Sequence, residues 1–520
     1  MPPSPRPLGP FGLILLSLVG LSGCVYLFRT VDTEEIDPGR PPTTVEAPVK
    51  AHLQDGSVAL FRTGATFTTD SIYGNAWQYG LNLNDSTRVT GLPLDSVAAL
   101  ETYRREYRTA ESLVVSALAS SATVVGTVGM AKALFGSCPT VYSKTDSLTL
   151  EAETFSNSIV PLFEMRDVNA LSTQADSSGA LTLEIRNEAL ETHYINHLEL
   201  VEAPHAPTET ALPTGDGRAW ILGDLRTPEM SDKWGRDQTD VLSAADGRAY
   251  RTPEAALRAV DSTQLTEHID VVLPAPVSDT AVVTLRLRNS LLNTLLLYDY
   301  MLADQGAEAL NWLGNEMEVI STALELSDFY RRRMGLRVHR IAGGTPRQVG
   351  RVSNVGPIAW SREAVAVPVP PDADSLRLRL SFLPDAWRID EVAVAHETRR
   401  IDPNRHELAA VRTPGHAPET ALADLRAPDH SYWVTRPTDR FWATFEPGSA
   451  PDSMARTFFL AAQGYYTEWM RRSWLEGPPR TSSTGPFTLT DQDLVNAIQE
   501  WATRRPDFEA QFRASKLPVH

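Results

Sequence analysis

Alternating apolar and polar positions dominate the chain from residue 139 onward. Within 181–200, 283–302 and 376–394, the runs LTLEIRN, VTLRLRN and LRLRLSF place an apolar side chain at every second position. Successive side chains of a strand point to opposite faces, so this period of two predicts strands with one buried face. We therefore expect a mainly β protein with helical segments, an α+β chain of several domains built on antiparallel sheets.

Residues 49–108 show the same alternation in shorter runs. The pair Asp55-Gly56 separates two apolar runs in HLQDGSVALF, and an Asp-Gly pair in this setting is a strong hairpin signal. The region is predicted to form a small N-terminal antiparallel sheet or barrel.

Short words recur in the same order in the two halves of the chain. HAPTETAL at 205–212 returns as HAPETAL at 416–422, and GDLRTPE at 223–229 returns as ADLRAPD at 423–429. Ordered recurrence favours duplication of one β module, which predicts two related β-sandwich modules.

Helical spacing interrupts the β pattern between these modules. Apolar residues at three- and four-residue intervals predict a helix over 306–334. Three arginines suit its C-terminus, and Gly335 ends it.

The C-terminal region is also predicted to be helical. One helix is expected over 454–474 and a second over 491–503, capped by Thr490 or Asp491. Pro506 is expected to end the second helix.

The first residues resemble the signal peptide of a bacterial lipoprotein. Arg6 precedes the apolar run 13–20, and Leu21-Ser22-Gly23-Cys24 follows it. This ending resembles a lipobox, and the resemblance implies that the Cys24 thiol becomes a thioether to diacylglycerol, with acyl chains such as palmitate. The alternative is a plain signal anchor that continues through 25–28.

Two further segments concern the membrane. The polar, proline-rich stretch that follows Cys24 is typical of an extended tether. Residues 109–136 contain an uncharged stretch, 113–131, about as long as the shortest membrane span. Its small residues, and arginines that would lie on the outer side, favour a buried or membrane-resting helical hairpin over a true span.

These patterns divide the chain into eight parts. They are a lipoprotein signal peptide (1–23), a tether (24–48), a small β domain (49–108), an apolar helical segment (109–136), a first β-sandwich module (137–304), a bridging helix (305–335), a second β-sandwich module (336–450) and a helical C-terminal region (451–520).

Composition narrows the possible partners. The 520 residues carry Lys+Arg 48 against Asp+Glu 65, for a net charge of −17. An acidic chain repels phosphate backbones, which disfavours a nucleic-acid partner. Two cysteines exclude a disulfide framework.

Three polar groupings could carry chemistry. His193 and His197 have zinc-like spacing, but they lie in a strand pattern that separates them by about 13 Å. Asp232, Asp237 and Asp240 fit a solvated acidic loop better than a Ca²⁺ loop. We therefore expect no metal ion and no cofactor.

The remaining candidates are a cysteine and a group of aromatic residues. Cys138 has no neighbouring histidine to activate it, so we interpret it as a buried structural residue. The C-terminal quarter holds aromatic residues that could stack on sugars but more often fill a core: Trp433, Trp442, Tyr465, Tyr466, Trp469 and Trp474.

Other words of the chain resemble a group of uncharacterised bacterial envelope proteins. The words are GSCPTVY at 136–142, EAE at 151–153 and NEALETHY at 187–194. The resemblance covers 136–300 and implies a β-rich fold outside the cytoplasm. It implies no activity and no functional residue.

The functional expectation follows from location and from missing motifs. The chain has no GxSxG, HExxH, Walker-type or GxGxxG motif. We expect a lipid-anchored envelope protein, in the outer membrane rather than the inner, that acts as a binding or assembly module for an envelope protein or glycan. The alternative is a carbohydrate-active or other hydrolase with a site between the β modules.

Overall fold

The computed structural model describes most of the chain outside its N-terminal segment. The described residues are 29–30, 43–45, 49–53, 55, 57–61, 63–79, 86–102, 106–107, 138–144, 147–275, 278–302, 326, 328–353, 355–371, 373–414, 417–429, 431–449, 453–469 and 489–515. With 51% strand and 18% helix, the fold is mainly β and antiparallel, which confirms the predicted class.

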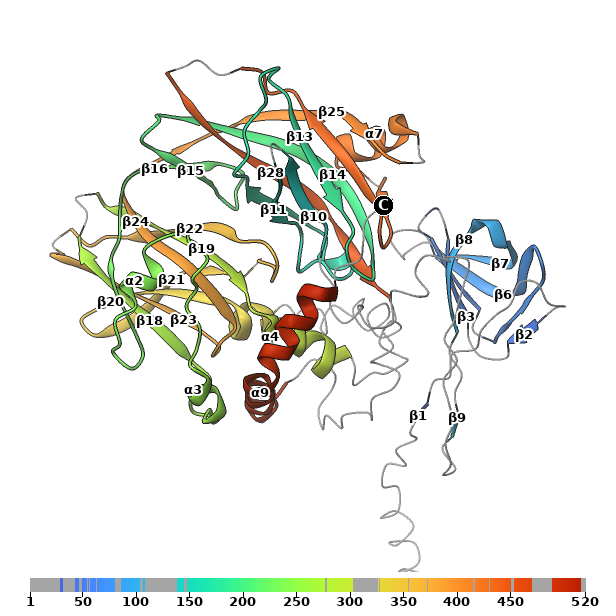
Figure 1. The fold of residues 1–520 in the computed structure, drawn as a ribbon, viewed down its shortest axis with the longest axis horizontal. Helices are drawn as coiled ribbons and strands as arrows, with labels where there is room; N and C mark the ends of the chain where they lie inside the picture. The colour runs from blue at the N-terminus through green and yellow to red at the C-terminus, as the bar shows by residue number, and fades with distance from the viewer. Residues whose placement is uncertain are drawn as a thin grey trace, which may run out of the picture.

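The largest sheet curls into a near-barrel (Figure 1). Ser172, which follows the last strand, donates hydrogen bonds to the Glu151 side chain of the first strand and so draws the two ends together. Apolar residues from all around the curl form one core. In spatial order the strands are β11 (Leu148–Glu153), β10 (Thr140–Lys144), β13 (Leu181–Arg186), β27 (Arg440–Phe445), β25 (Asn404–Arg412), β14 (Glu191–His205), β28 (Ala455–Glu468) and β12 (Met165–Ala170), with β26 (Trp433–Thr435) paired to β14.

Two five-stranded sheets form a sandwich over a second core. The first sheet runs β15 (Thr210–Pro213), β16 (Ala219–Arg226), β24 (Trp387–Ile401), β19 (Thr280–Asn289) and β22 (Ser361–Pro368). The second runs β17 (Glu229–Asp232), β18 (Glu267–Pro274), β23 (Ser375–Phe382), β20 (Leu336–Ala342) and β21 (Thr345–Val352).

The sequence order of these units differs from the predicted modules. The strands of the sandwich come from residues 210–401. In the sequence this segment is inserted between the two parts that form the near-barrel, 140–205 and 404–468. The boundaries expected at 304 and 336 therefore do not separate the two units. Pairing between distant strands, such as β13 with β27, decides the division instead.

The recurring words also take different structures. Residues 219–226 form strand β16, whereas the matching word lies in helix α7 (Pro418–Arg426). Pro418 lies at the start of that helix, where proline is favoured, and Leu425 is buried. These words therefore do not mark a structural repeat, although β13 and β23 each lead into a strand of 15 residues.

A separate N-terminal sheet encloses its own small core (blue in Figure 1). Its strands run β2 (Thr43–Val45), β5 (Ala65–Phe67), β6 (Ser71–Tyr79), β4 (Val58–Phe61), β3 (Val49–Leu53) and β8 (Val97–Thr102), with β7 (Ser86–Pro93) on β6. The predicted hairpin at Asp55 is confirmed, because β3 pairs with β4. The tether prediction is wrong at 43–45, since β2 belongs to this sheet.

The C-terminal region corrects one helix prediction. Residues 455–468 form β28, a strand that pairs with β14 and β12. Both of its faces are buried, Leu460 against the near-barrel core and Phe459 against the sandwich, so its middle, FFLAA at 458–462, is a continuous apolar run. Such a run has no distinctive period, and its aromatic content was the better guide.

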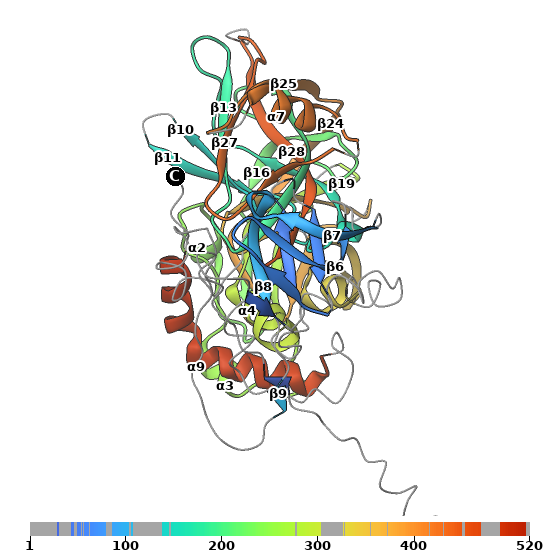
Figure 2. The same cartoon turned by 90° about the vertical axis from the view of Figure 1, so that its right-hand side faces the viewer.

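The last helix, α9 (Asp491–Ser515), confirms the second prediction and lies across the end of the sandwich (Figure 2). Thr490 and Asp493 cap it reciprocally, side chain to backbone, at 3.2 and 2.8 Å. Pro506 does not end it, because Phe508 in the next turn packs on Trp501 in the sandwich core.

Several predictions lie outside the described residues. They concern the signal peptide, Cys24, the segment 109–136, Trp474 and most of the helix predicted over 306–334. The described end of that helix is helical and is followed by Gly335, as expected. Among the helices that the structure describes, none is both long and apolar enough to cross a membrane. The remaining short elements are η1 (Leu94–Ser96), η2 (Pro161–Phe163), α2 (Thr239–Leu242) and α3 (Glu254–Arg258).

Candidate functional site

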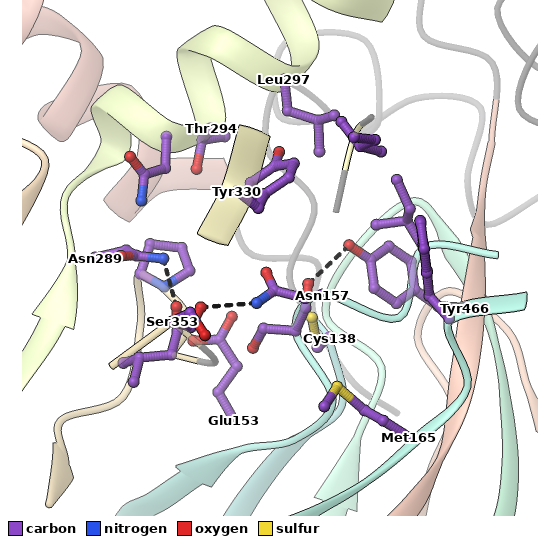
Figure 3. Close-up of a pocket in the computed structure, with 18 of the residues that line it drawn as sticks. Cys138, Glu153, Asn157, Met165, Asn289, Thr294, Leu297, Tyr330, Ser353 and Tyr466 are labelled. Atoms are coloured by element: carbon purple, nitrogen blue, oxygen red, sulfur yellow. Dashed lines mark hydrogen bonds between the residues drawn. The ribbon is translucent and has the colours of Figure 1, made fainter. Parts of the chain in front are cut away.

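A cavity of about 370 Å³ lies where the near-barrel meets the sandwich (Figure 3). This volume lies within the range of small-molecule sites. On the near-barrel side its walls come from Cys138 just before β10, from β11, β12 and β28, and from the segment 156–163. The other walls come from the end of β19, from residues 353 and 355–357, and from helical segments around 293–298 and 326–331. The cavity therefore joins parts of the chain that are far apart in sequence.

Two π-helical segments contribute to this cavity. The segment η3 (Leu296–Leu302) follows α4 (Leu291–Leu295) directly and supplies Leu297 and Tyr298, and η5 (Tyr330–Met334) supplies Tyr330 and Arg331. A π-helix is rare, and it frequently occurs at functional sites. The local geometry thus favours a functional role for this cavity.

The near-barrel side of the cavity carries an apolar patch beside the polar Glu153 and Asn157. Ile159, Phe163 and Met165 line it, together with the Tyr466 ring. The Tyr466 hydroxyl donates to the Ser156 carbonyl at 3.1 Å, which fixes the ring against the wall (Figure 3). This side can bury an apolar group.

The opposite side carries a polar patch beside apolar residues such as Leu297 and Val355. Asn289 at the end of β19, and Asn293 and Thr294 on α4, line it, and Figure 3 shows Asn289 and Thr294 across the cavity from Tyr466. Within the described part of the chain, the Oδ1 atoms of Asn289 and Asn293 are buried and have no hydrogen-bond partner. A buried amide oxygen without a partner is costly, so it requires an explanation such as a ligand.

The loop 355–359 closes the cavity over Glu153. The Oε2 atom of Glu153 accepts hydrogen bonds from the backbone of Ile358 at 2.9 Å and Ala359 at 3.4 Å. A Cβ at Gly356 would collide with the Glu153 carboxylate. Glycine at 356 therefore allows the loop to lie directly on this side chain.

Cys138 lines the cavity and is buried, as predicted. Burial, together with the charges of Glu153 and Glu191, raises the pKa of the Cys138 thiol well above its usual value. The thiol is therefore neutral at physiological pH and is a weak nucleophile.

A buried polar network lies behind the cavity wall. The Tyr298 hydroxyl donates to the Glu468 carboxylate and approaches Glu191 at 3.5 Å. His193 Nε2 lies 3.3 Å from Glu191, and its ring meets Tyr466 edge-on at 6.4 Å. Burial lowers the pKa of His193 to about 3, so this histidine is neutral. The network holds two cavity-lining tyrosines in place.

The histidine pair lies in strand β14, as predicted from the alternation. His193 is fully buried and His197 is half-buried, with a bulge between Ile195 and His197. Across the described residues, no group of three or more His, Cys, Asp or Glu side chains could hold a metal ion.

The predicted solvated loop is exposed at Asp237 and Asp240 but not at Asp232. Asp232 is buried and accepts hydrogen bonds from the backbone of Trp234 and Arg236 at 2.9 and 3.1 Å. The expectation of a solvated residue is therefore wrong for Asp232, because its carboxylate holds the turn together.

Most of the described C-terminal aromatic residues pack inside the molecule. Tyr465 and Tyr466 are buried on β28, while Trp433 and Trp442 are half-buried. Trp469 stacks on His52 of the N-terminal sheet at 5.3 Å and so joins that sheet to the near-barrel.

Sequence reasoning missed the polar side of the cavity. Asn187 and Asn289 occupy the same place in the recurring strand words, after LTLEIR and VTLRLR. Asn187 uses both ends of its amide, with donor contacts to Glu191 and Thr435 and an acceptor contact to Ala189. Asn289 differs only in its tertiary surroundings, and no local signal distinguishes the two.

Comparison with known proteins identifies no family. No family model and no curated protein matches the chain. Among solved structures, the chain is similar to a GH31 α-xylosidase from Xanthomonas citri, with 10% identity over 84% of this chain and 34% of that one and a TM-score of 0.15. It is also similar to the arabinofuranosyltransferase AftD from Mycobacteria, with 11% identity over 85% and 31% and a TM-score of 0.17. The chain spans about a third of the length of each protein, and similarity this weak carries no argument.

Proposed function

We propose that the protein is a membrane-tethered envelope lipoprotein that binds a small, largely apolar molecule in the cavity between its near-barrel and its sandwich. One observation carries the binding role: among the described residues, buried amide oxygens without partners line a cavity that also has an apolar patch. A buried acceptor of this kind is stabilised when a ligand supplies the missing donor.

The tether follows from the lipobox-like Cys24 and from one strand pairing. Strand β1 (Arg29–Thr30) pairs antiparallel with β9 (Glu106–Tyr107). The chain just after Cys24 and the chain just before the apolar segment 109–136 therefore run side by side at one place (Figure 1). This arrangement supports one membrane-facing end, with the outer membrane as the proposed location.

The hydrolase alternative needs two carboxylates, or a nucleophile beside a histidine, in one pocket. Of the described cavity-lining residues, Glu153 is the one carboxylate, and the Cys138 thiol is held neutral. Binding is therefore the better-supported function.

Photolabelling of the full chain in detergent tests the binding site. The probe is an eight-carbon alcohol that carries a diazirine, and labelled peptides are mapped by mass spectrometry. We expect saturable labelling of cavity peptides that non-photoreactive octanol competes away. The Leu297→Trp substitution, which fills the cavity, should abolish it, whereas Leu225→Trp at an exposed position should not. Labelling that does not saturate, or that survives Leu297→Trp, would contradict the proposal.

Metabolic labelling with a fatty-acid analogue tests the anchor. The wild-type chain should take up the label and fractionate with membranes, and Cys24→Ser should prevent both. Equal labelling of wild type and Cys24→Ser would refute lipidation at Cys24.

A further inference from the structure

We infer that the cavity selects an amphipathic ligand whose polar head donates hydrogen bonds, such as an aliphatic alcohol or amine, and that it rejects the matching carboxylate. The inference rests on the proposed binding function and adds the chemical class of the ligand. It is carried by the orientation of two buried amides on the polar side of the cavity.

Asn289 offers an acceptor in a fixed orientation. Its Nδ2 donates to the Val355 carbonyl, and its backbone nitrogen donates to the Gly356 carbonyl at 3.0 Å. The amide cannot rotate without losing the Val355 contact, so Oδ1 is the atom left for a ligand. Within the described structure this oxygen is buried and unpartnered.

Asn293 supplies a second acceptor. It lies on α4, whose first turn is held by the Ser290 side chain accepting from the Leu292 backbone at 3.1 Å. Its Oδ1 is also buried and, among described residues, without a partner. The neighbouring Thr294 hydroxyl can serve as donor or acceptor, so the two amide oxygens decide the selectivity.

The charges around the cavity also favour a head that donates hydrogen bonds over a carboxylate. A carboxylate head would place its oxygens against the Asn289 oxygen and near the acidic Glu153 side chain, where the facing oxygens repel and neither group can donate a hydrogen bond. Arg331, at the cavity wall, could favour an anion, but it is half in solvent and its guanidinium bonds to Asp328 at 3.3 Å. A donor head avoids this repulsion: an alcohol can donate to one of the two amide oxygens, and an ammonium group has enough donors for both.

The apolar side sets the rest of the ligand. Ile159, Phe163 and Met165 provide a surface for a short aliphatic or aromatic body rather than for a polyhydroxylated one. Tyr298 and Tyr330 add aromatic faces, which an ammonium group can also contact favourably.

Matched photoprobes test this inference on the full chain. Three eight-carbon diazirine probes differ only in their head: alcohol, amine or carboxylate. The alcohol and amine should label cavity peptides with half-saturation at least about tenfold below that of the carboxylate. Asn289→Leu should weaken the alcohol by about fivefold and leave the carboxylate unchanged or improved.

A substitution that adds a negative charge at the cavity should change the preference between the amine and the alcohol, and the same substitution at an exposed site is its control. Asn293→Asp should strengthen the amine relative to the alcohol, while Asn404→Asp, which adds the same charge at an exposed site, should not. If the carboxylate labels the cavity as well as the alcohol does, the donor-head inference fails while the binding function stands. If no probe labels the cavity in a way that Leu297→Trp blocks, the binding function itself fails.

Discussion

Helical segments cover the ends of both β cores, and they differ in how completely they satisfy the polar groups beneath them. At the sandwich end, α9 inserts Trp501 into the core, and its Nε1 donates to Asp385 at 2.6 Å. Both Asp385 oxygens also accept from Arg388, and Thr252 and Arg505 complete the set. Both oxygens of this buried carboxylate therefore accept hydrogen bonds.

At the cavity end, α4, η3 and η5 leave space and unpartnered acceptors. Asn289 and Asn293 keep buried oxygens that no described residue satisfies. The Asp385 cluster shows that this fold can supply a hydrogen-bond donor to a buried acceptor where only packing is required. The contrast supports the proposal that the cavity holds a ligand, whereas the Asp385 cluster stabilises the fold.

The largest expected effect is a loss of stability at the end of the sandwich that α9 covers. Trp501→Ala removes a fully buried indole and one of the donors to Asp385, so the free energy of unfolding should fall by about 3–5 kcal/mol. Urea denaturation followed by circular dichroism measures it. Trp234→Ala, at an exposed tryptophan, is the control and should change little. A loss below about 1 kcal/mol for Trp501→Ala would show that α9 does not complete the sandwich core.

A second substitution tests the loop at the cavity end. In Gly356→Ala the new Cβ meets the Glu153 carboxylate, so the loop must shift and stability should fall by about 1–3 kcal/mol. Probe labelling of the cavity should weaken as well. Gly215→Ala, where a Cβ meets nothing within 4 Å, should be nearly neutral in both measurements. Equal behaviour of the two variants would place the loop away from Glu153.

The third test uses pH and the buried histidine behind the cavity wall. Burial outweighs the opposing charges of Glu468 and Asp439 and lowers the pKa of His193 from 6.5 to about 3. Between these values the unfolded chain binds a proton that the folded chain does not. Stability should therefore fall as pH drops from 6.5 towards 3, by up to about 1.4 kcal/mol per unit.

His193→Gln isolates this contribution. The variant keeps a polar side chain beside Glu191 but cannot titrate, so its stability should depend less steeply on pH between 6.5 and 4. Identical slopes for wild type and His193→Gln would mean that His193 is not held neutral.

Part of the candidate site was accessible from sequence. The absence of a histidine beside Cys138 in the sequence correctly predicted a buried cysteine, and the alternation around His193 correctly predicted a strand. The polar side of the cavity was not accessible. Asn289 gains its role only because Val355, 66 residues away, holds its amide, and local patterns contain no information about such a neighbour.

The sequence by itself determined the local structure: a period of two produced strands such as β13, β19 and β23, and the Thr490 cap began α9. Tertiary structure decided what local patterns left open. ADLR at 423–426 became part of helix α7 while GDLR at 223–226 became part of strand β16, and the apolar run at 458–462 became part of the strand β28. Short words and continuous apolar runs have nearly equal local preferences for either state, so burial against distant partners selects one. The same long-range pairing closed the near-barrel from two distant parts of the sequence, with the sandwich segment between them, and created the cavity where the two units meet.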